Sequence, residues 1–445
     1  MLDSAKKTLR GKIINCVDEG NSKIESELDR LKSSLADTRM LLEEVANSVN
    51  SEHISSEYML DSMCVCRKPR VLVLGYYGAK NLGDELMLQS LLKRLDRKDL
   101  SITIMLDNNR NIDASYYAPF NVLHYPTKTD DILKLAQNYD YIIWGGGAVL
   151  DDAWYGFNYA KICLSYILLK ASIAAIKLKK KVFVLGVSTN KTLSDGALIK
   201  DLQCVIKGAE YFYLRDENSL KTLEKAGIDC SNVEIIDDLA ISDLPAARYR
   251  KSDSNNDEIN VGFSFLMNGD NIEAICKCIE NVIRAARKEV PNKKVVINLI
   301  PFYSSNRPDS DEMFFERLIS AGSLKTADRV IVHDFPCTIE ELGDIITSCD
   351  CFITMRYHGA LVSSMLGVKT LVVDFSNQHR HYFNKLDYLK KHYCDFDKID
   401  FDKISDPLSI NSAIKKLLNQ KASPYSRDLI DLSDKTLVKI LKQIN

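Results

Sequence analysis

Residues 71–85 read VLVLGYYGAKNLGDE, a strand pattern that runs into a glycine-containing loop and ends in two carboxylates at a helix start. The apolar run 71–74 is typical of a strand that is covered on both faces in a parallel sheet. The glycines allow close approaches of the backbone that a Cβ would prevent. Ligands of open α/β sheets bind at such strand-to-helix edges, so the stretch predicts a binding site. The alternative is a plain turn in which Asp84 only caps the helix.

From residue 70 onward, strand patterns alternate with helical patterns, which is typical of doubly wound α/β domains. A polar stretch without periodicity divides this alternation into two sets. We therefore expect an α/β protein with two Rossmann-like domains that face a cleft, a common location for ligands. The expected strands are 71–74, 102–106, 141–144, 182–185, 211–214 and 233–236 in the first domain, and 261–265, 295–299, 329–332, 351–354 and 370–373 in the second.

The length of 445 residues exceeds that of one ordinary domain. Apolar residues recur at spacings of three and four over residues 14–49, the heptad pattern of a coiled coil, and predict a homo-oligomer. A single amphipathic helix packed on its own domain is the alternative. The expected parts are a helical or coiled-coil segment at 1–66, a first Rossmann-like domain at 67–245, a linker at 246–259, a second Rossmann-like domain at 260–404 and a helical tail at 405–445.

The composition is that of a globular protein, with 46% hydrophobic residues, 27% charged residues and a formal net charge of −2. This balance gives no indication of nucleic-acid binding. The N-terminus lacks the apolar core of a signal peptide, and polar residues interrupt the most apolar helix candidate, 162–178, so no transmembrane segment is expected. The 12 cysteines are spread thinly, and their CxC pairs lack structural zinc spacing. We expect a cytoplasmic, reduced protein without a bound metal.

Glycines and carboxylates follow the third expected strand, 141–144. The run of three glycines includes Gly146 and Gly147, and Asp151 and Asp152 come shortly afterwards. Backbone N–H groups in such a run suit an anion or a sugar hydroxyl. Tight packing of the backbone explains the same glycines equally well.

Arg215 follows the expected strand 211–214 and lies at the same predicted sheet edge. A fixed guanidinium there can bind phosphate or carboxylate with two parallel hydrogen bonds. The alternative is a structural ion pair with Asp216 or Glu217.

The second domain carries Arg356 and His358 in the turn after the strand 351–354. A guanidinium can hold an oxyanion, and an imidazole can bind phosphate and move a proton near neutral pH. A short turn can direct both side chains to one ligand. His379 and Arg380 follow the next strand and add polar groups at this edge, although a solvated loop has a similar composition.

Four motifs occur in one order: GYYGAKNLGDE, WGGGAVLDD, LRDENSLKTLEKAGI with the Asp237-Asp238 that follows, and MRYHGALVSSMLGV. Together they resemble the polysaccharide pyruvyl transferase family over roughly residues 70–400. The resemblance implies a fold like that of two-domain GT-B glycosyltransferases. It also implies transfer of a pyruvyl group from phosphoenolpyruvate to a sugar of a capsule, an exopolysaccharide or a precursor, forming a ketal. Phosphoenolpyruvate is the co-substrate, and no other cofactor is expected.

The implied reaction assigns roles to the candidate residues. Two cationic anchors, Arg215 and Arg356, would hold the carboxylate and phosphate of the donor from opposite domains. His358 is assigned to phosphate binding and is a candidate proton donor, and Asp151 or Asp152 orients or deprotonates the acceptor.

The loop before the first helix is assigned to the sugar acceptor. Its residues Asn81, Asp84 and Glu85 are neutral or acidic and suit hydroxyl groups better than phosphate. The family context is compatible with a lipid-linked acceptor at the inner membrane face.

The chain departs from the family pattern at one point. Where members commonly show a tyrosine and then a lysine, this sequence has Phe375 and Gln378, and His379 or Arg380 could compensate. Two other functions stay open: a GT-B glycosyltransferase that uses a nucleotide sugar, and a non-catalytic glycan-binding scaffold.

Overall fold

The computed structural model describes most of the chain after residue 67, and Lys68–Asn445 forms one compact unit. The coiled coil expected at 14–49 lies outside the described residues, as do His379 and Arg380, so these expectations stay predictions. The described ranges are 68–95, 99–107, 114–158, 161–190, 192–243, 257–266, 271–305, 310–336, 338–375, 385–392, 396–420 and 427–444.

Seven parallel strands form the first sheet, in the order β3-β2-β1-β4-β7-β8-β9. The connections run outward in opposite directions from the β1–β4 pair, so the strand order reverses there. A two-stranded antiparallel hairpin, β5 and β6, is separate from this sheet. The bounds are β1 (Arg70–Tyr77), β2 (Ser101–Leu106), β3 (Asn121–His124), β4 (Tyr141–Leu150), β5 (Phe157–Asn158), β6 (Lys161–Ile162), β7 (Lys181–Thr189), β8 (Tyr211–Leu214) and β9 (Val233–Ile235).

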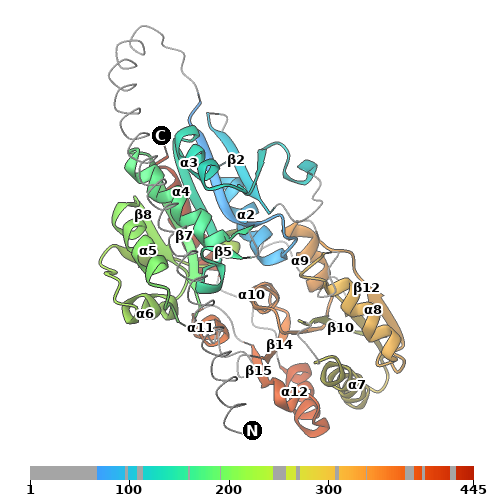
Figure 1. Ribbon diagram of the computed structural model, residues 1–445. Helices are drawn as coiled ribbons and strands as arrows, with labels where there is room; N and C mark the ends of the chain where they lie inside the picture. Colours follow the sequence, from blue (N-terminus) through green and yellow to red (C-terminus); the bar gives the residue numbers. More distant parts are fainter. Residues whose placement is uncertain are drawn as a thin grey trace, which may run out of the picture. The chain divides into compact units, whose positions relative to one another are not determined.

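Helices cover both faces of the first sheet, which explains the continuous apolar run in β1. Leu72 and Leu74 pack in one core cluster with α4, whereas Val71 and Val73 pack in another with α2. Figure 1 shows α3 and α5 on either side of α4. The bounds are α2 (Leu82–Leu95), α3 (Thr129–Asn138), α4 (Leu164–Lys177), α5 (Gly196–Gly208) and α6 (Glu217–Lys225).

Six parallel strands form the second sheet, in the order β12-β11-β10-β13-β14-β15. One face packs against α7, α8 and α12, and Figure 1 shows α7 near α12. The other face packs against α9, α10 and α11. The bounds are β10 (Glu258–Ser264), β11 (Lys294–Leu299), β12 (Arg329–Val332), β13 (Cys351–Thr354), β14 (Lys369–Asp374), β15 (Asp397–Asp400), α7 (Ile272–Glu289), α8 (Asp311–Ala321), α9 (Ile339–Thr347), α10 (Tyr357–Met365), α11 (Lys385–His392) and α12 (Pro407–Asn419).

The cores of the two sheets are joined. Residues of α2 from the first set and of α10 from the second belong to one apolar cluster. The last helix, α13 (Arg427–Leu441), packs against α2 and the short helix η3 (Leu239–Asp243). There, the Nε of Arg94 donates a hydrogen bond of 2.7 Å to Asp434. Burial of apolar side chains therefore continues from one sheet to the other.

The predicted fold class, with two Rossmann-like parallel sheets, is confirmed. Three strands continue well past their expected ends: β1 through Gly75 to Tyr77, β4 through its glycines to Leu150, and β7 through Gly186 to Thr189. Four of the described strands were not predicted: the two strands of the hairpin, β5 and β6, and the sheet-edge strands β3 and β15. The sequences of β3 and β15, NVLH and DKID, are short and partly polar, as is usual for strands at sheet edges. No helix in the described part of the chain is long and apolar enough to cross a membrane.

Candidate active site

A cavity of about 270 Å³ lies where residues from both sheets meet. Apart from Leu164, which begins α4, its first-sheet residues lie at or after the ends of β1, β4, β7 and β8, and its second-sheet residues come from the start of α10. The β1–β4 pair is the point at which the strand order reverses, the position where ligands bind in doubly wound sheets. The lining residues are Tyr76, Asn81, Asp84, Ala148, Val149, Asp151, Leu164, Asn190, Arg215, Tyr357 and His358.

A buried carboxylate beside this cavity joins the two sheets. Asp238 follows β9, and its Oδ2 lies 3.0 Å from the Nη1 of Arg215 and 3.5 Å from the Nε2 of His358. Asp238 is only 1% exposed, and Arg215 only 5%. Burial alone would raise the pKa of Asp238, but His358 and Arg215 hold it well below its usual value. Asp238 is therefore a fixed negative charge shared by two basic side chains.

Tyr357, the first residue of α10, orients both basic groups. The Arg215 guanidinium lies over the Tyr357 ring, 5.0 Å from its centre, a cation–π arrangement. The Tyr357 ring also meets the His358 ring edge to face, with 5.1 Å between the centres. The guanidinium therefore has a charged partner and an aromatic neighbour, and both restrict its orientation.

Gly83 gives His358 the room it needs. A Cβ on Gly83 would lie 1.9 Å from the Nδ1 of His358, closer than any pair of non-bonded atoms can come. The imidazole from the second sheet thus lies against the backbone of α2 from the first. This contact explains why the loop expected at residues 75–85 needs a glycine at that place.

Two of the three acceptor candidates in this loop, Asn81 and Asp84, line the cavity. Asp84 approaches β4 closely, since a Cβ on Gly147 would lie 2.9 Å from its Oδ1. Gly146 and Gly147 have φ values of +88° and +95°, which favour glycine. Both glycines are buried and neither lines the cavity. Gly147 therefore leaves space for Asp84, and Gly146 leaves space for the Met87 side chain.

Glu85, the third acceptor candidate, lies away from the cavity. It is 1% exposed, and its carboxylate accepts hydrogen bonds from the Gly78 N–H at 2.9 Å and the Tyr117 hydroxyl at 3.1 Å. Burial raises the pKa of Glu85 to about 7, although these two donors counteract part of the effect. Glu85 therefore holds the loop from within the core.

The two carboxylates after β4 differ in position. Asp151 lines the cavity, accepts the Ala153 N–H at 2.9 Å and accepts a hydrogen bond from the side chain of Asn190. Asp152 instead accepts the N–H and the hydroxyl of Ser194, both at 2.7 Å, and does not line the cavity. The structure thus brings Asp151, rather than Asp152, to the same cavity as Arg215 and His358.

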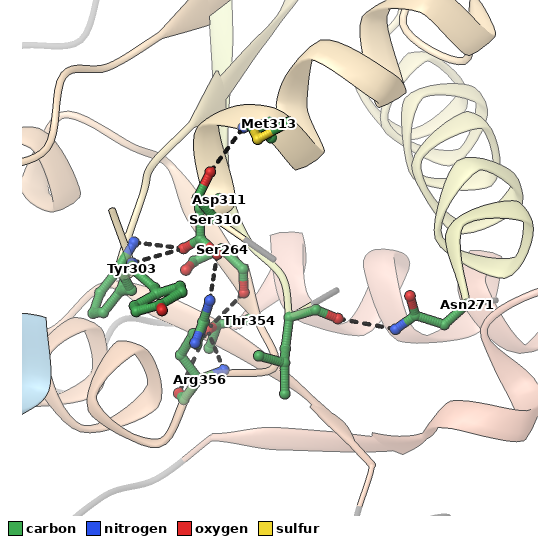
Figure 2. A network of polar contacts seen from close by, with 10 residues as sticks. Ser264, Asn271, Tyr303, Ser310, Asp311, Met313, Thr354 and Arg356 are labelled. Atoms are coloured by element: carbon green, nitrogen blue, oxygen red, sulfur yellow. Dashed lines mark hydrogen bonds and ion pairs between the residues drawn. The ribbon is translucent and has the colours of Figure 1, made fainter. Parts of the chain in front are cut away.

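Arg356 is directed elsewhere. Its guanidinium donates to Asp311, as Figure 2 shows, and Arg356 is not among the residues that line the cavity. Its backbone N–H donates to the hydroxyl of Thr354 at 3.0 Å. The two arginines expected to act together are therefore held by separate carboxylates, Asp238 and Asp311.

Sequence reasoning missed several residues of this site. Tyr76, Asn190 and Tyr357 line the cavity, and Asp238 pairs with its two basic side chains. Tyr76 stands beside the loop glycines in the first quoted motif, and Tyr357 stands beside His358 in the last. These positions were the signal in the sequence that could have identified both tyrosines as site residues. Among the described residues, no group of three or more His, Cys, Asp or Glu side chains could hold a metal ion.

A family model described as polysaccharide pyruvyl transferase matches residues 81–377, about two thirds of the chain. The chain belongs to the polysaccharide pyruvyl transferase family. The resemblance drawn from the four motifs is thereby confirmed. No curated protein sequence matches this family member.

Solved structures similar to this pyruvyl transferase family member show the same fold. The UDP-GlcNAc 2-epimerase from Methanocaldococcus jannaschii has a TM-score of 0.53 at 11% identity, over 84% of this chain and 99% of that one. A putative UDP-N-acetylglucosamine 2-epimerase from Listeria monocytogenes has a TM-score of 0.52 at 12% identity, over 85% and 97%. The enzyme from Rickettsia bellii gives 0.52 at 9% identity, over 85% and 96%. These neighbours confirm a GT-B-like fold, and at such low identity they show the fold alone.

Replacing Gly83 with alanine should displace the His358 ring, because the new Cβ overlaps its Nδ1. We expect a loss of roughly 1–3 kcal/mol in the free energy of unfolding, as is usual for overpacking. Urea unfolding measures this loss, and the imidazole NMR signal of His358, assigned with His358→Gln, should shift. Gly196→Ala is the matched control, since a Cβ there meets no atom within 4 Å. An unshifted His358 signal in Gly83→Ala would contradict the close approach.

Replacing Glu85 with glutamine should flatten the pH dependence of stability. The pKa of Glu85 is raised from 4.5 to about 7 in the folded state. The stability that protonation of Glu85 contributes is therefore fully present below pH 4.5 and is lost as the pH rises toward 7. The shift corresponds to roughly 3 kcal/mol. The unfolding free energy of the unsubstituted protein, relative to Glu85→Gln, should fall by about that amount from pH 4.5 to pH 8.

Urea unfolding at both pH values provides the measurement. Glu316→Gln, at an exposed position of α8, serves as the control for removal of one carboxylate. The assignment fails if the Glu85→Gln difference is the same at both pH values.

Proposed function

We propose that this protein transfers the pyruvyl group of phosphoenolpyruvate to two hydroxyls of a sugar, forming a pyruvate ketal on a cell-surface polysaccharide or its precursor. One observation carries the proposal: Arg215 and His358, from different sheets, meet at Asp238 beside one cavity. Family membership supports the reaction class.

The donor end of the cavity is assigned to Arg215 and His358. Phosphoenolpyruvate carries a carboxylate and a phosphate, and a guanidinium recognises either with two charge-assisted hydrogen bonds. Arg215 is held on two sides, by Asp238 and by the Tyr357 ring, so little side-chain freedom remains to be lost on binding. His358 adds a group that can bind phosphate and transfer a proton.

The acceptor end is assigned to Asp151, with Asn81, Asp84 and Asn190 beside it. Carboxylate and amide oxygens accept hydrogen bonds from sugar hydroxyls. The Asp151 carboxylate is oriented by two donors, the Ala153 N–H and the Asn190 side chain. Asp151 is therefore the better placed of the two candidate carboxylates to receive a hydroxyl proton.

The reaction balances with these groups. A proton is added to C3 of phosphoenolpyruvate and converts the methylene carbon into a methyl group. Two sugar hydroxyls form bonds to C2 and each loses its proton, while the bond from C2 to the phosphate oxygen breaks. Inorganic phosphate leaves with one of the protons, and the other replaces the proton delivered to C3. We assign delivery to His358 and removal from the first hydroxyl to Asp151.

The donor assignment is tested by thermal unfolding with phosphoenolpyruvate or with a UDP-sugar, together with phosphate release in the presence of galactose- or mannosamine-type acceptors. We expect stabilisation by phosphoenolpyruvate, and phosphate release only with an acceptor. Stabilisation by the UDP-sugar alone would refute the donor and favour glycosyl transfer. Sugar binding without phosphate release would favour a glycan-binding protein.

Two substitutions separate the roles within the reaction. His358→Gln should lower kcat by roughly 10²–10⁴-fold, the usual contribution of a general acid. Arg215→Lys should mainly raise the KM for phosphoenolpyruvate, because lysine cannot reproduce a two-bond contact. His124→Gln, at an exposed position, and Arg329→Lys, in a surface ion pair with Glu258, are the matched controls. Full activity of His358→Gln would remove it from the mechanism.

A further inference from the structure

A buried carboxylate outside the cavity, Asp311, contacts two separate parts of the molecule. Figure 2 shows it at the start of α8, where its side chain is 1% exposed. Its Oδ2 accepts the backbone N–H groups of Phe302 and Tyr303 at 2.7 and 3.0 Å. Its Oδ1 accepts a hydrogen bond from the Arg356 guanidinium. Each oxygen of Asp311 therefore has its own set of partners.

The backbone held by Asp311 pairs with the acceptor loop of the first domain. The Leu82 N–H donates to the Phe302 carbonyl at 2.8 Å, and the Ser304 N–H donates to the Lys80 carbonyl at 3.1 Å. Between these bonds, Asn81 and Tyr303 form an antiparallel bridge. We call this pairing of residues 80–82 with 302–304 the backbone bridge. It contains Asn81 and ends two residues before Asp84, and these two residues line the cavity.

The guanidinium held by Asp311 belongs to the turn that presents His358. The Arg356 side chain is 15% exposed, and its Nε is buried without a hydrogen-bond partner among the described residues. Asp311 thus determines where the guanidinium points and leaves the Nε unused. Burial raises the pKa of Asp311, an effect that Arg356 and the two backbone donors counteract in part. Removal of the guanidinium would leave a poorly compensated buried carboxylate.

We propose that Asp311 is a positioning residue that couples Arg356 to the backbone bridge, so that one carboxylate sets both the turn that presents His358 and the acceptor loop. The inference rests on the proposed function, which assigns His358, two residues after Arg356, to the donor and Asn81 and Asp84 to the acceptor. Asp311 acts through these groups and does not touch the substrates.

Asp311→Asn tests the coupling, because an amide has one acceptor oxygen and can satisfy only one of the two sets of partners. We expect the KM values for phosphoenolpyruvate and for the sugar each to rise at least threefold, with a smaller change in kcat. Ser310→Ala is the matched control, since the Ser310 hydroxyl caps the same helix by accepting the Met313 N–H, whereas the Arg356 guanidinium donates to Asp311. Equal KM values in Asp311→Asn and Ser310→Ala would overturn the proposal.

A double-mutant cycle separates the effect of Asp311 on the donor KM from its effect on the acceptor KM. In an Arg356→Met background, Asp311→Asn should change the donor KM by less than twofold, because the donor effect runs through Arg356. The acceptor effect, which runs through the backbone bridge, should persist. A donor effect of full size in the Arg356→Met background would refute the route through Arg356.

Hydrogen–deuterium exchange tests the coupling without any turnover. In Asp311→Asn and in Arg356→Met, the peptides that contain Leu82 and Ser304 should exchange at least tenfold faster than in Ser310→Ala. Unchanged exchange in both variants would overturn the coupling. A lack of phosphoenolpyruvate turnover in the unsubstituted protein would refute the proposed function, and the exchange result would still decide the role of Asp311. If Asp311→Asn does not fold, Arg356→Met alone decides it.

Discussion

The site depends on the buried carboxylate of Asp238. Arg215 and His358 come from different sheets, and each would be poorly compensated in a buried position without an opposite charge. Asp238 supplies that charge to both, at 3.0 Å from Arg215 and 3.5 Å from His358, and these two groups hold its pKa below the usual value. A proton on His358 would give the three groups a net positive charge at the cavity wall. An anionic donor is the natural complement of such a wall.

Close backbone contact makes this electrostatic arrangement possible. Gly83 lets the His358 ring rest on α2, and Gly147 lets the Asp84 carboxylate approach β4. A Cβ on Gly83 would block the first contact, and a Cβ on Gly147 would block the second. The apolar cluster shared by α2 and α10 holds the two sheets together around these contacts, so the polar groups of the cavity are positioned by packing that lies outside it.

The sequence predicts the sheets well because their signals are local. The apolar run 71–74 and the strand at Tyr211–Leu214 were recognisable from a few neighbouring residues, and the structure has both. The site was predicted less completely, since its contacts join distant positions. Nothing near Asp238 in the sequence shows that it would meet His358, and nothing near Asp311 points to Arg356. Glu85 looked like a cavity residue by its place in the motif, yet helix geometry turns it toward Gly78 and Tyr117 while Asp84 faces the cavity.

Each of the two candidate donor arginines has its own buried acid, and this pairing bears on how a ligand could bind. Arg215 pairs with Asp238 and Arg356 with Asp311, so the charges are largely balanced before any substrate arrives. The binding free energy of a donor is therefore only a difference. It is the gain from contacts with the guanidinium groups minus the loss from the carboxylate contacts that the donor weakens or shares. Arg215 keeps its position at the cavity while paired, so it can accept a ligand without moving. Arg356 is held outside the cavity wall, and its contribution depends on how Asp311 and the backbone bridge orient the turn that it shares with His358.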